Sequence, residues 1–182
     1  GAGTGATAAK ALGQLFSIKG GIGTASIEVS NGAIVGALMV VNAIGDVVDP
    51  DTGEIVAGPR TETGFDNSVE LMIKTTSKDS GFFRNTTIGV VATDAKLDKI
   101  GATRLAIAGQ DGIALAVRPA HTANDGDTVF GLSTGTHAEH VSGDTLHAAA
   151  LKAVSGAILN AIDSAETLGG VLSAKDAKAK FV

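Results

Sequence analysis

Hydrophobic and polar positions in the first quarter of the chain predict a β-hairpin. Gly20–Glu28 and Ala33–Asn42 are rich in β-branched residues, which favour strands. Asn31-Gly32 stands between the two runs, and this dipeptide in such a place is a strong hairpin signal. Before the hairpin, the glycine- and alanine-rich stretch Gly1–Lys10 is expected to be a loop that leads into a short helix.

The pattern of the second half predicts strands and helices in alternation. Thr86–Ala92 is typical of a buried strand, and Thr93-Asp94 is expected to cap the helix that follows it. Apolar residues at near-helical spacing extend that helix over Leu97–Val117. A polar loop at His121–Asp127 then precedes a short strand at Thr128–Ser133.

A second amphipathic helix is expected over Asp144–Leu168, with Gly169-Gly170 as its stop. The polar region Arg60–Arg84 has no clear period and is expected to be a long surface excursion. A hairpin followed by strand, helix, strand and helix indicates an α/β fold in which helices cover a mixed sheet. No repeat or linker interrupts the pattern, so we expect a single domain over residues 1–182.

Composition and charge narrow the classes of function. The 182 residues include 25 glycines but no cysteine, which excludes disulfide scaffolds, thiolate metal sites and a cysteine nucleophile. The net charge is −5, and without a basic run this disfavours a nucleic-acid partner. No apolar run reaches the roughly 18 residues of a membrane span, so we expect no membrane partner. The composition leaves the compartment open, and a cytoplasmic location is our expectation. Gly1 in place of Met indicates a processed chain or a piece of a longer one.

Three glycine-rich motifs look like functional loops but lack the context that those loops need. Gly1–Gly5 and Gly20–Gly23 resemble phosphate loops, but a dinucleotide fingerprint needs a strand before it and a helix after it. Tight turns are the better interpretation of both. Gly131–Gly135 (GLSTG) matches the serine-hydrolase elbow, but a loop-like stretch follows it, so we interpret it as the end of a strand.

Two acidic residues and three histidines are further candidates for chemistry. Asp125 and Asp127 stand in a pattern like that of aspartate-nucleophile phosphatases, but a polar loop replaces the hydrophobic strand that should precede it. Acids in a turn usually make turn hydrogen bonds, yet these two lie directly before a buried strand, so they remain candidates. The histidines have no spacing typical of a metal site and are expected to be solvated; they are His137, His140 and His147.

The junction Asn85-Thr86 is the most suggestive position, because the polar excursion meets a buried strand there. A threonine hydroxyl is a poor nucleophile until a base removes its proton. Cleavage of the Asn85–Thr86 bond would give Thr86 a free α-amine, with a pKa of about 7.7–8.0, which can act as that base. The same hydroxyl can make the cut by attacking the Asn85 carbonyl in an N-to-O acyl shift. From these residues alone, a loop ending in a β-favouring pair is the simpler interpretation.

Three motifs occur in order along the chain: Gly1–Ser26 (GAGTGATAAK…KGGIGTAS), Asn85–Leu97 (NTTIGVVATDAKL) and Arg118–Gly135 (RPAHTANDGDTVFGLSTG). Together they resemble the self-processing DmpA-type aminopeptidases, a family that includes β-peptidyl aminopeptidases and nylon-oligomer hydrolases. The resemblance covers nearly all of the chain. It implies a fold like that of N-terminal-nucleophile hydrolases, a stacked αββα-type sandwich with mixed sheets.

The resemblance also implies a precursor that cuts itself between Asn85 and Thr86 into two associated chains, 1–85 and 86–182. Thr86 would then be the N-terminal nucleophile of an amide hydrolase that forms an acyl-enzyme and needs no metal or organic cofactor. The implied substrates are short peptides, β-peptides or amide oligomers such as 6-aminohexanoate oligomers, and the implied assembly is a homo-oligomer. Two alternatives are an acyltransferase of the same architecture and a structural or binding subunit without activity.

Site roles follow from the matching motifs. Lys10 corresponds to the lysine placed near the nucleophile, and Asn42 corresponds to the asparagine that helps to stabilise the oxyanion. Asp125 and Asp127 correspond to paired acids that border the site in the nylon-oligomer hydrolases. There they would compensate the charge of Lys10 and of the new amine, or receive a substrate ammonium.

This chain departs from the family pattern in two respects. Family precursors carry a substantial segment upstream of the region that matches Gly1, and that segment contributes part of the substrate pocket. The nucleophile is Thr86, whereas the founding aminopeptidases have serine. Threonine favours the branch shared with nylon-oligomer hydrolases, without fixing the substrate.

Overall fold

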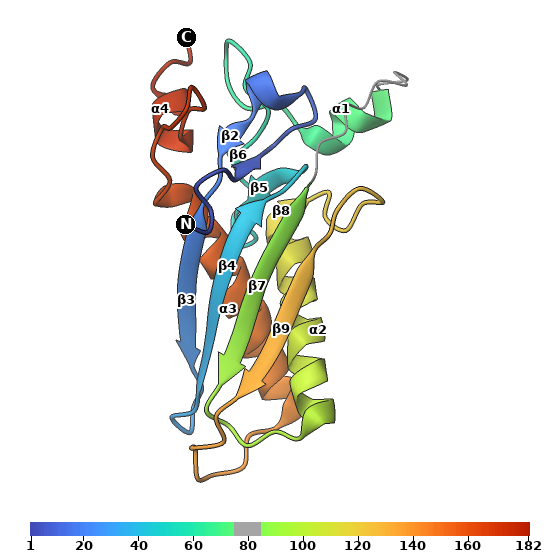
Figure 1. Cartoon of the computed structure of the whole chain (residues 1–182), viewed down its shortest axis with the longest axis vertical. Helices are drawn as coiled ribbons and strands as arrows, with labels where there is room; N and C mark the ends of the chain where they lie inside the picture. Colours follow the sequence, from blue (N-terminus) through green and yellow to red (C-terminus); the bar gives the residue numbers. More distant parts are fainter. Residues whose placement is uncertain (75–84) are drawn as a thin grey trace.

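A four-stranded sheet lies at the centre of the computed structural model, which describes residues 1–74 and 85–182 (Figure 1). Its strands lie in the order β3 (Ile22–Glu28), β4 (Ile34–Asn42), β7 (Thr86–Thr93) and β9 (Thr128–Ser133). β4 is antiparallel to both β3 and β7, whereas β9 runs parallel to β7. The expected α/β class with mixed sheets is confirmed.

Two long helices cover one face of this sheet (Figure 1). α2 (Lys99–Ala116) connects the parallel strands β7 and β9, and α3 (Gly143–Asp163) packs against β3 and β4. Buried residues of both helices and of the sheet form one hydrophobic core. α3 has the length and apolar composition of a membrane span, but 56% of that segment is buried because it packs on the sheet.

Smaller elements gather at one end of the sheet, at the top of Figure 1. β5 (Asp46–Val48) lies between β6 (Ile55–Ala57) and β8 (Val117–Arg118) in a second sheet. β1 (Thr7–Ala8) pairs with β2 (Ile18–Lys19). The short helices of the described residues are η1 (Gln14–Phe16), α1 (Ser68–Lys74) and α4 (Ala174–Lys178).

Several elements predicted from the hydrophobic pattern are confirmed, above all the β3–β4 hairpin and the helix α2 that ends before Arg118-Pro119. The short helix predicted near Gly1–Lys10 is wrong, because strand β1 forms there and pairs with β2. The predicted excursion Arg60–Arg84 contains the short helix α1. Its residues 75–84 lie outside the described part of the chain.

The predicted helix boundaries need two corrections. Asp98, not Thr93-Asp94, caps α2, and its carboxylate accepts a 2.7 Å bond from a first-turn N–H. Asp94 instead accepts a 2.8 Å bond from the backbone N–H of Ile34. α3 ends at Asp163 and not at Leu168 as predicted. The predicted stop Gly169-Gly170 lies beyond the helix, in a turn with positive φ at both glycines.

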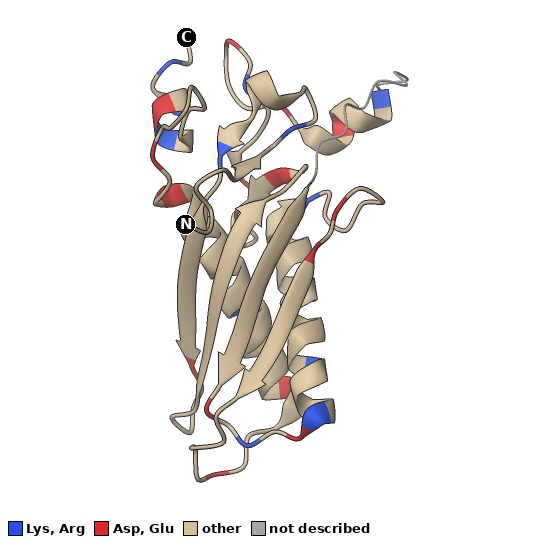
Figure 2. Ribbon diagram, viewed as in Figure 1, with Lys and Arg blue, Asp and Glu red and all other residues tan. Residues whose placement is uncertain are grey.

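The other face of the four-stranded sheet carries exposed apolar side chains. Figure 2 shows Lys, Arg, Asp and Glu mainly at the ends of the strands, on the helices and in loops, while the strands are nearly free of them. Large apolar residues of this face are at least 40% exposed, namely Ile22, Ile34, Leu38, Ile88, Phe130 and Leu132. A solvated sheet face usually carries polar residues, so this one has the character of a packing surface.

Glycines let the helices approach the sheet closely. A Cβ added at Gly131 in β9 would lie 2.1 Å from the carbonyl oxygen of Ala102 in α2. A Cβ at Gly23 in β3 would lie equally close, 2.1 Å, to the carbonyl oxygen of Ala157 in α3. Glycine at these two positions therefore sets the distance between the layers.

We predict that Gly131→Ala lowers the free energy of unfolding by about 1–3 kcal/mol, the usual cost of overpacking. Gly36→Ala in β4 is the matched control, because its added Cβ meets only the carbonyl oxygen of Ala25, at 3.9 Å. Urea unfolding followed by circular dichroism measures both variants. Equal unfolding midpoints would contradict the close contact between β9 and α2.

Candidate active site

Strand pairing brings the predicted site residues to one end of the four-stranded sheet. Asn42 at the end of β4 is directly opposite Thr86 at the start of β7. Asn85, just before β7, forms a parallel bridge with Asp125 in the loop that precedes β9. Lys10 follows β1 and reaches both asparagines. Residues from four distant segments therefore meet around the Asn85–Thr86 bond.

Lys10 is buried, with 4% of its surface exposed, and its ammonium connects β4 to the start of β7. Nζ donates to the main-chain oxygen of Asn42 at 3.3 Å, to its Oδ1 at 3.0 Å and to Oδ1 of Asn85 at 2.9 Å. Burial lowers the pKa of Lys10 to about 8, and the negative charge of Asp125 opposes this shift. A buried lysine with a lowered pKa is typical of functional sites.

The side chain of Asn42 is held in one orientation by two donors. Its Oδ1 accepts hydrogen bonds from Lys10 Nζ at 3.0 Å and from the backbone N–H of Thr7 at 3.1 Å. The amide of an asparagine has one acceptor oxygen and one donor nitrogen. With Oδ1 engaged by donors, the remaining polar atom of the side chain is the donor Nδ2, and the role of Asn42 at an oxyanion stays a prediction.

The hydroxyl of Thr86 lies beside the carbonyl group of the preceding residue. Thr86 Oγ1 donates to the main-chain oxygen of Asn85 at 2.5 Å. The same oxygen accepts a 2.9 Å bond from the backbone N–H of Gly126. Asn85 is 2% exposed and Thr86 is half-buried. The candidate nucleophile is therefore next to the peptide bond that it is predicted to cut.

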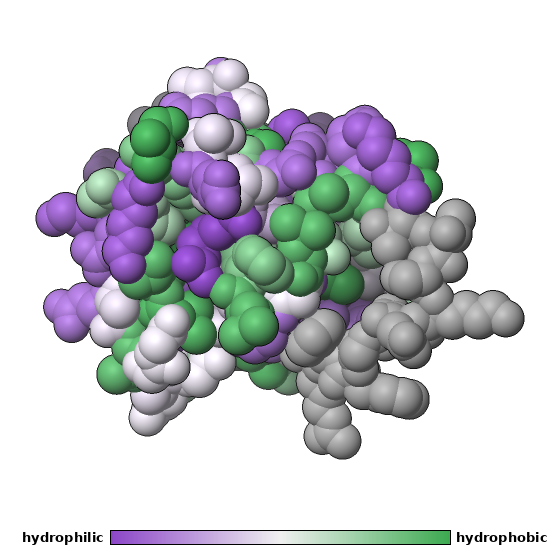
Figure 3. All heavy atoms as spheres, turned by 90° about the horizontal axis from the view of Figure 1, so that it is seen from above, coloured by the Kyte–Doolittle hydropathy of each residue, from purple (hydrophilic) through white to green (hydrophobic). Residues whose placement is uncertain are grey.

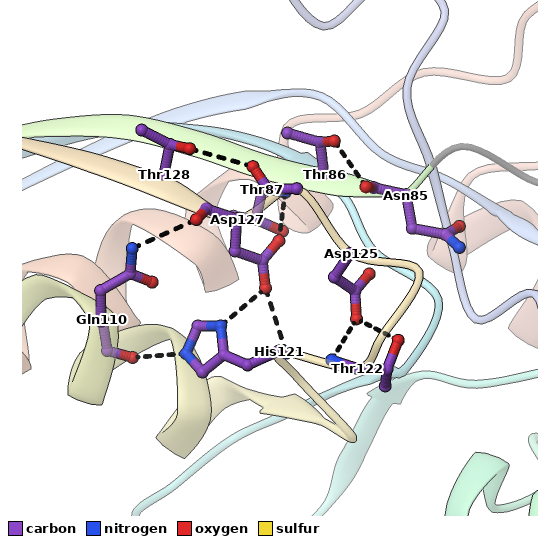
Figure 4. Close-up of polar contacts among 10 residues, drawn as sticks. Asn85, Thr86, Thr87, Gln110, His121, Thr122, Asp125, Asp127 and Thr128 are labelled. Carbon is purple, nitrogen blue, oxygen red and sulfur yellow. Dashed lines mark hydrogen bonds and ion pairs between the residues drawn. The ribbon is translucent and has the colours of Figure 1, made fainter.

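Asp127 holds the start of β7 to the loop before β9, as Figure 4 shows. Its Oδ1 accepts a 2.6 Å bond from the backbone N–H of Thr87. Its Oδ2 accepts from the ring Nδ1 of His121 at 2.9 Å and from the backbone N–H of His121 at 3.2 Å. Only 5% of the Asp127 side chain is exposed. This acid therefore fixes the residue that follows the candidate nucleophile.

Asp125 shapes the same loop from within. Its Oδ2 accepts bonds from the backbone N–H of Thr122 at 2.9 Å and from its hydroxyl at 2.7 Å, as drawn in Figure 4. Its negative charge also opposes the lowering of the Lys10 pKa that burial causes. Asp125 thus makes the turn hydrogen bonds expected of an acid in such a loop, and its role beside a substrate stays a prediction.

Three residues around the site were missed by the sequence analysis. His121 has φ of 56°, and its ring lies between Asp127 and the main-chain oxygen of Gln110, 3.2 Å from Nε2. Gln110 also donates from Nε2 to the main-chain oxygen of Asp127 at 3.3 Å. Both lie in segments that the sequence marks only as loop and helix, so no local signal singles them out.

Lys19 is the third missed residue. It is 5% exposed, and its Nζ donates to the carbonyl oxygens of Gly3, Ala6 and Gly20 at 3.1, 2.8 and 2.8 Å. Burial lowers its pKa. Lys19 thereby ties down the segment that leads to Thr7 and Lys10, and nothing in its sequence context distinguishes it from a surface lysine.

The competing candidates lie elsewhere or have other partners. Ser133 of the GLSTG motif donates to the carbonyl oxygen of Ala95 at 2.6 Å, and a loop follows it, which confirms the interpretation as a strand end. The predicted solvated surface histidines are partly confirmed: His140 is exposed, but Nε2 of His137 is buried without a hydrogen-bond partner in the described chain. His147 contacts Asp111 at 3.3 Å. Within residues 1–74 and 85–182, no group of three or more His, Asp or Glu could hold a metal ion.

A cavity of about 420 Å³ lies away from the Asn85–Thr86 bond. It is lined by α2 and α3 residues near the first turns of both helices, among them Arg104, Leu105 and His147. Figure 1 places these turns at the opposite end of the sheet from the start of β7. Figure 3, seen from the end where the small sheets lie, shows apolar and hydrophilic side chains interspersed over the middle of that end.

The fold and site define an α/β protein with a candidate nucleophilic threonine at the start of a sheet strand. The sequence pattern of Peptidase family S58 matches residues 1–175, and the chain belongs to this family. An uncharacterized aminopeptidase of Mycobacterium leprae is 40% identical over 175 residues, which cover 85% of this chain and 47% of the relative. The chain therefore spans about half the length of the curated relatives that it matches.

Solved structures agree on the fold. A β-aminopeptidase of a Burkholderia species has a TM-score of 0.53 and 25% identity, over 88% of this chain and 44% of that one. The L-aminopeptidase D-Ala-esterase/amidase of Ochrobactrum anthropi, described as a variant of the Ntn hydrolase fold, has a TM-score of 0.57 and 23% identity. The match covers 91% of this chain and 48% of the Ochrobactrum anthropi chain. The expected relation to N-terminal-nucleophile hydrolases is confirmed at the level of the fold.

We predict that the wild-type protein gains stability relative to Lys10→Met as the pH rises from about 8 to 10.5. The folded state lowers the pKa of Lys10 from 10.5 to about 8, so the unfolded chain binds more protons at this residue across that range. The charged form is the one that burial disfavours, so its cost to the folded state is removed as the pH increases. Urea unfolding of both proteins at several pH values measures the difference, and a constant difference would contradict the buried ammonium.

We predict that His121→Ala speeds hydrogen exchange of the Thr87 amide by about 10-fold, since a lost hydrogen bond of this kind costs roughly 1–1.5 kcal/mol. The change removes the ring nitrogen from Asp127 Oδ2 and leaves that oxygen with the backbone N–H of residue 121 alone, while Oδ1 holds Thr87. His140→Ala at an exposed histidine is the control. NMR measures the exchange rate of the Thr87 amide in both variants, and equal rates would show that His121 does not hold Asp127.

Proposed function

We propose that this chain is the catalytic portion of a self-processing amide hydrolase whose nucleophile is Thr86. The observation that carries the proposal is the position of Thr86 Oγ1, 2.5 Å from the main-chain oxygen of Asn85, at the start of a central strand. Lys10 and Asn42 lie on one side of this bond, and the loop containing Asp125 lies on the other.

Self-cleavage begins when Thr86 Oγ attacks the carbonyl carbon of Asn85. The new C–O bond forms, the C–N bond breaks, and the hydroxyl proton ends on the departing nitrogen of Thr86. Water then hydrolyses the resulting ester, which leaves a carboxylate on Asn85 and a free α-amine on Thr86. The products are chains 1–85 and 86–182.

The two chains stay together after the cut, because the cleaved bond precedes a central strand that keeps both of its neighbours. Residues Val35–Asn42 of the first chain pair with Thr86–Thr93 of the second. α3, from the second chain, also packs against β3 and β4 of the first. Cleavage therefore creates a free terminus without removing a packed layer.

Hydrolysis of a substrate repeats the same chemistry on an external amide. The α-amine of Thr86 accepts the hydroxyl proton as Oγ attacks the substrate carbonyl, and Asn42 donates to the developing oxyanion. The protonated Lys10 nearby favours the neutral, basic form of that amine by like-charge repulsion. An acyl-enzyme forms on Thr86, and water releases it.

Short peptides, β-peptides or amide oligomers with a free amine are the substrate class that we propose. Two comparisons support it: the Mycobacterium leprae relative is named an aminopeptidase, and the Burkholderia structure is a β-aminopeptidase. Asp125 and Asp127 supply negative charge for a substrate ammonium beside Thr86. Because the chain spans about half of its relatives, we also propose that further sequence covers the open sheet face and completes the pocket.

We predict that the purified chain separates into fragments 1–85 and 86–182, and that Thr86→Ala remains intact. Thr87→Val is the matched control: the Thr87 hydroxyl has no hydrogen-bond partner among the described residues, and valine has nearly the same shape. Intact-mass spectrometry during incubation measures the cut.

An uncut wild-type chain, or cleavage of Thr86→Ala at the same bond, would contradict the proposal. A free-amine amide substrate tested with and without an added amine separates hydrolysis from transfer. Transfer products in place of the free acid would identify an acyltransferase instead.

A further inference from the structure

The loop before β9 contacts the main chain of the bond that is proposed to be cut. Asn85 and Asp125 form a parallel β-bridge, which places Gly126 next to the peptide group that joins Asn85 to Thr86. The backbone N–H of Gly126 donates to the main-chain oxygen of Asn85 at 2.9 Å. This hydrogen bond reaches the oxygen that becomes negative when Thr86 Oγ attacks.

Glycine at position 126 also leaves space for the nucleophile. A Cβ added to Gly126 would lie 2.8 Å from Thr86 Oγ1, closer than real Cβ atoms approach other heavy atoms. The same Cβ would be 3.8 Å from the main-chain oxygen of Asn85. A side chain here would therefore displace the hydroxyl or the loop, and with the loop the N–H donor.

We propose that Gly126 is a catalytic residue of the self-cleavage step, which rests on the function proposed above. Its N–H stabilises the oxyanion that forms on the Asn85 carbonyl, and its lack of a side chain admits Thr86 Oγ1 to the attacking position. Attack joins Oγ to the carbonyl carbon and moves the carbonyl π electrons onto the oxygen. Collapse expels the Thr86 nitrogen, which takes the hydroxyl proton.

Besides the attacking hydroxyl of Thr86, which also donates to the main-chain oxygen of Asn85, the polar side chains near this bond have other hydrogen-bond partners. Lys10 donates to the side-chain oxygen of Asn85, not to its main-chain oxygen. Asn42 Oδ1 is an acceptor for Lys10 and Thr7. Among the described residues, the N–H of Gly126 is thus a backbone donor that contacts the oxygen of the reacting carbonyl group.

Hydrogen bonds of the two flanking residues hold the loop that carries this donor. Asp125, the residue before Gly126, accepts two hydrogen bonds from Thr122. Asp127, the residue after it, accepts hydrogen bonds from His121 and Thr87 (Figure 4). A donor that is held in place lowers a barrier more than one that must reorganise. The paired acids on either side of Gly126 therefore act on self-cleavage by positioning its N–H.

The first test is the self-cleavage rate of Gly126→Ala in freshly translated full chain, followed by gel and intact mass. We expect cleavage at least about 10-fold slower than in the wild type, since loss of an oxyanion donor costs about 10²–10³ in rate. Gly143→Ala is the matched control, because an added Cβ there meets nothing within 4 Å. Circular dichroism shows whether both variants fold.

Two further variants distinguish the effect of the missing side chain at position 126 from the effect of the hydrogen bond that the Gly126 N–H donates. Thr86→Ser combined with Gly126→Ala should recover part of the lost rate, because serine lacks the methyl group that limits rotation of the hydroxyl. Gly126→glycolic acid replaces the N–H by an ester oxygen without adding bulk, and should slow cleavage while the fold is retained.

The outcomes distinguish this inference from the proposed function. If the wild type is not cut at Asn85–Thr86, the proposed function fails. If the wild type is cut and the glycolic acid variant is cut at the same rate, the function stands and Gly126 is not the donor. If Gly126→Ala folds and is cut as fast as Gly143→Ala, the space at this position is not required.

Discussion

The site is organised around one buried positive charge, the ammonium of Lys10. A charged amine removed from water is costly unless hydrogen bonds and opposite charge replace its hydration. Here the main-chain and side-chain oxygens of Asn42 and the side-chain oxygen of Asn85 accept hydrogen bonds from the ammonium, and Asp125 supplies negative charge. Satisfying Lys10 therefore draws together the end of β4, the residue before β7 and the loop before β9, which are the parts that flank Thr86.

The surrounding fold makes this arrangement possible by fixing two registers. The antiparallel register of β4 and β7 sets Asn42 against Thr86, and the parallel connection from β7 through α2 to β9 brings the following loop to the same end. Glycines at the helix–sheet contacts keep these layers close. The polar residues of the site thus lie at one end of the central strands, where Thr86 is half-buried and its neighbours are held by hydrogen bonds.

The hydrophobic pattern predicted much of this fold because strands and helices leave periodic traces in a sequence. The β3–β4 hairpin and α2 followed from β-branched runs, Asn31-Gly32 and near-helical spacing. Predictions failed where a distant partner decided the outcome. Asp94 is a good cap by composition, but Ile34 across the sheet occupies its carboxylate, and strand β1 forms because β2 is available to pair with it. For the site, the family resemblance offered Lys10, Asn42, Asp125 and Asp127 as candidates that the fold brings together, whereas His121 depends on contacts that no local pattern records.

The most direct test of the account is to find which residue carries an acyl group during turnover. The protein would be incubated with a slowly hydrolysed ester that has a free amine, quenched in acid and analysed by peptide mapping. The account predicts an adduct on a peptide whose first residue is Thr86, with the mass of the acyl group of the ester. An adduct on another residue such as Ser133, or an adduct on a chain uncut before Thr86, would contradict it.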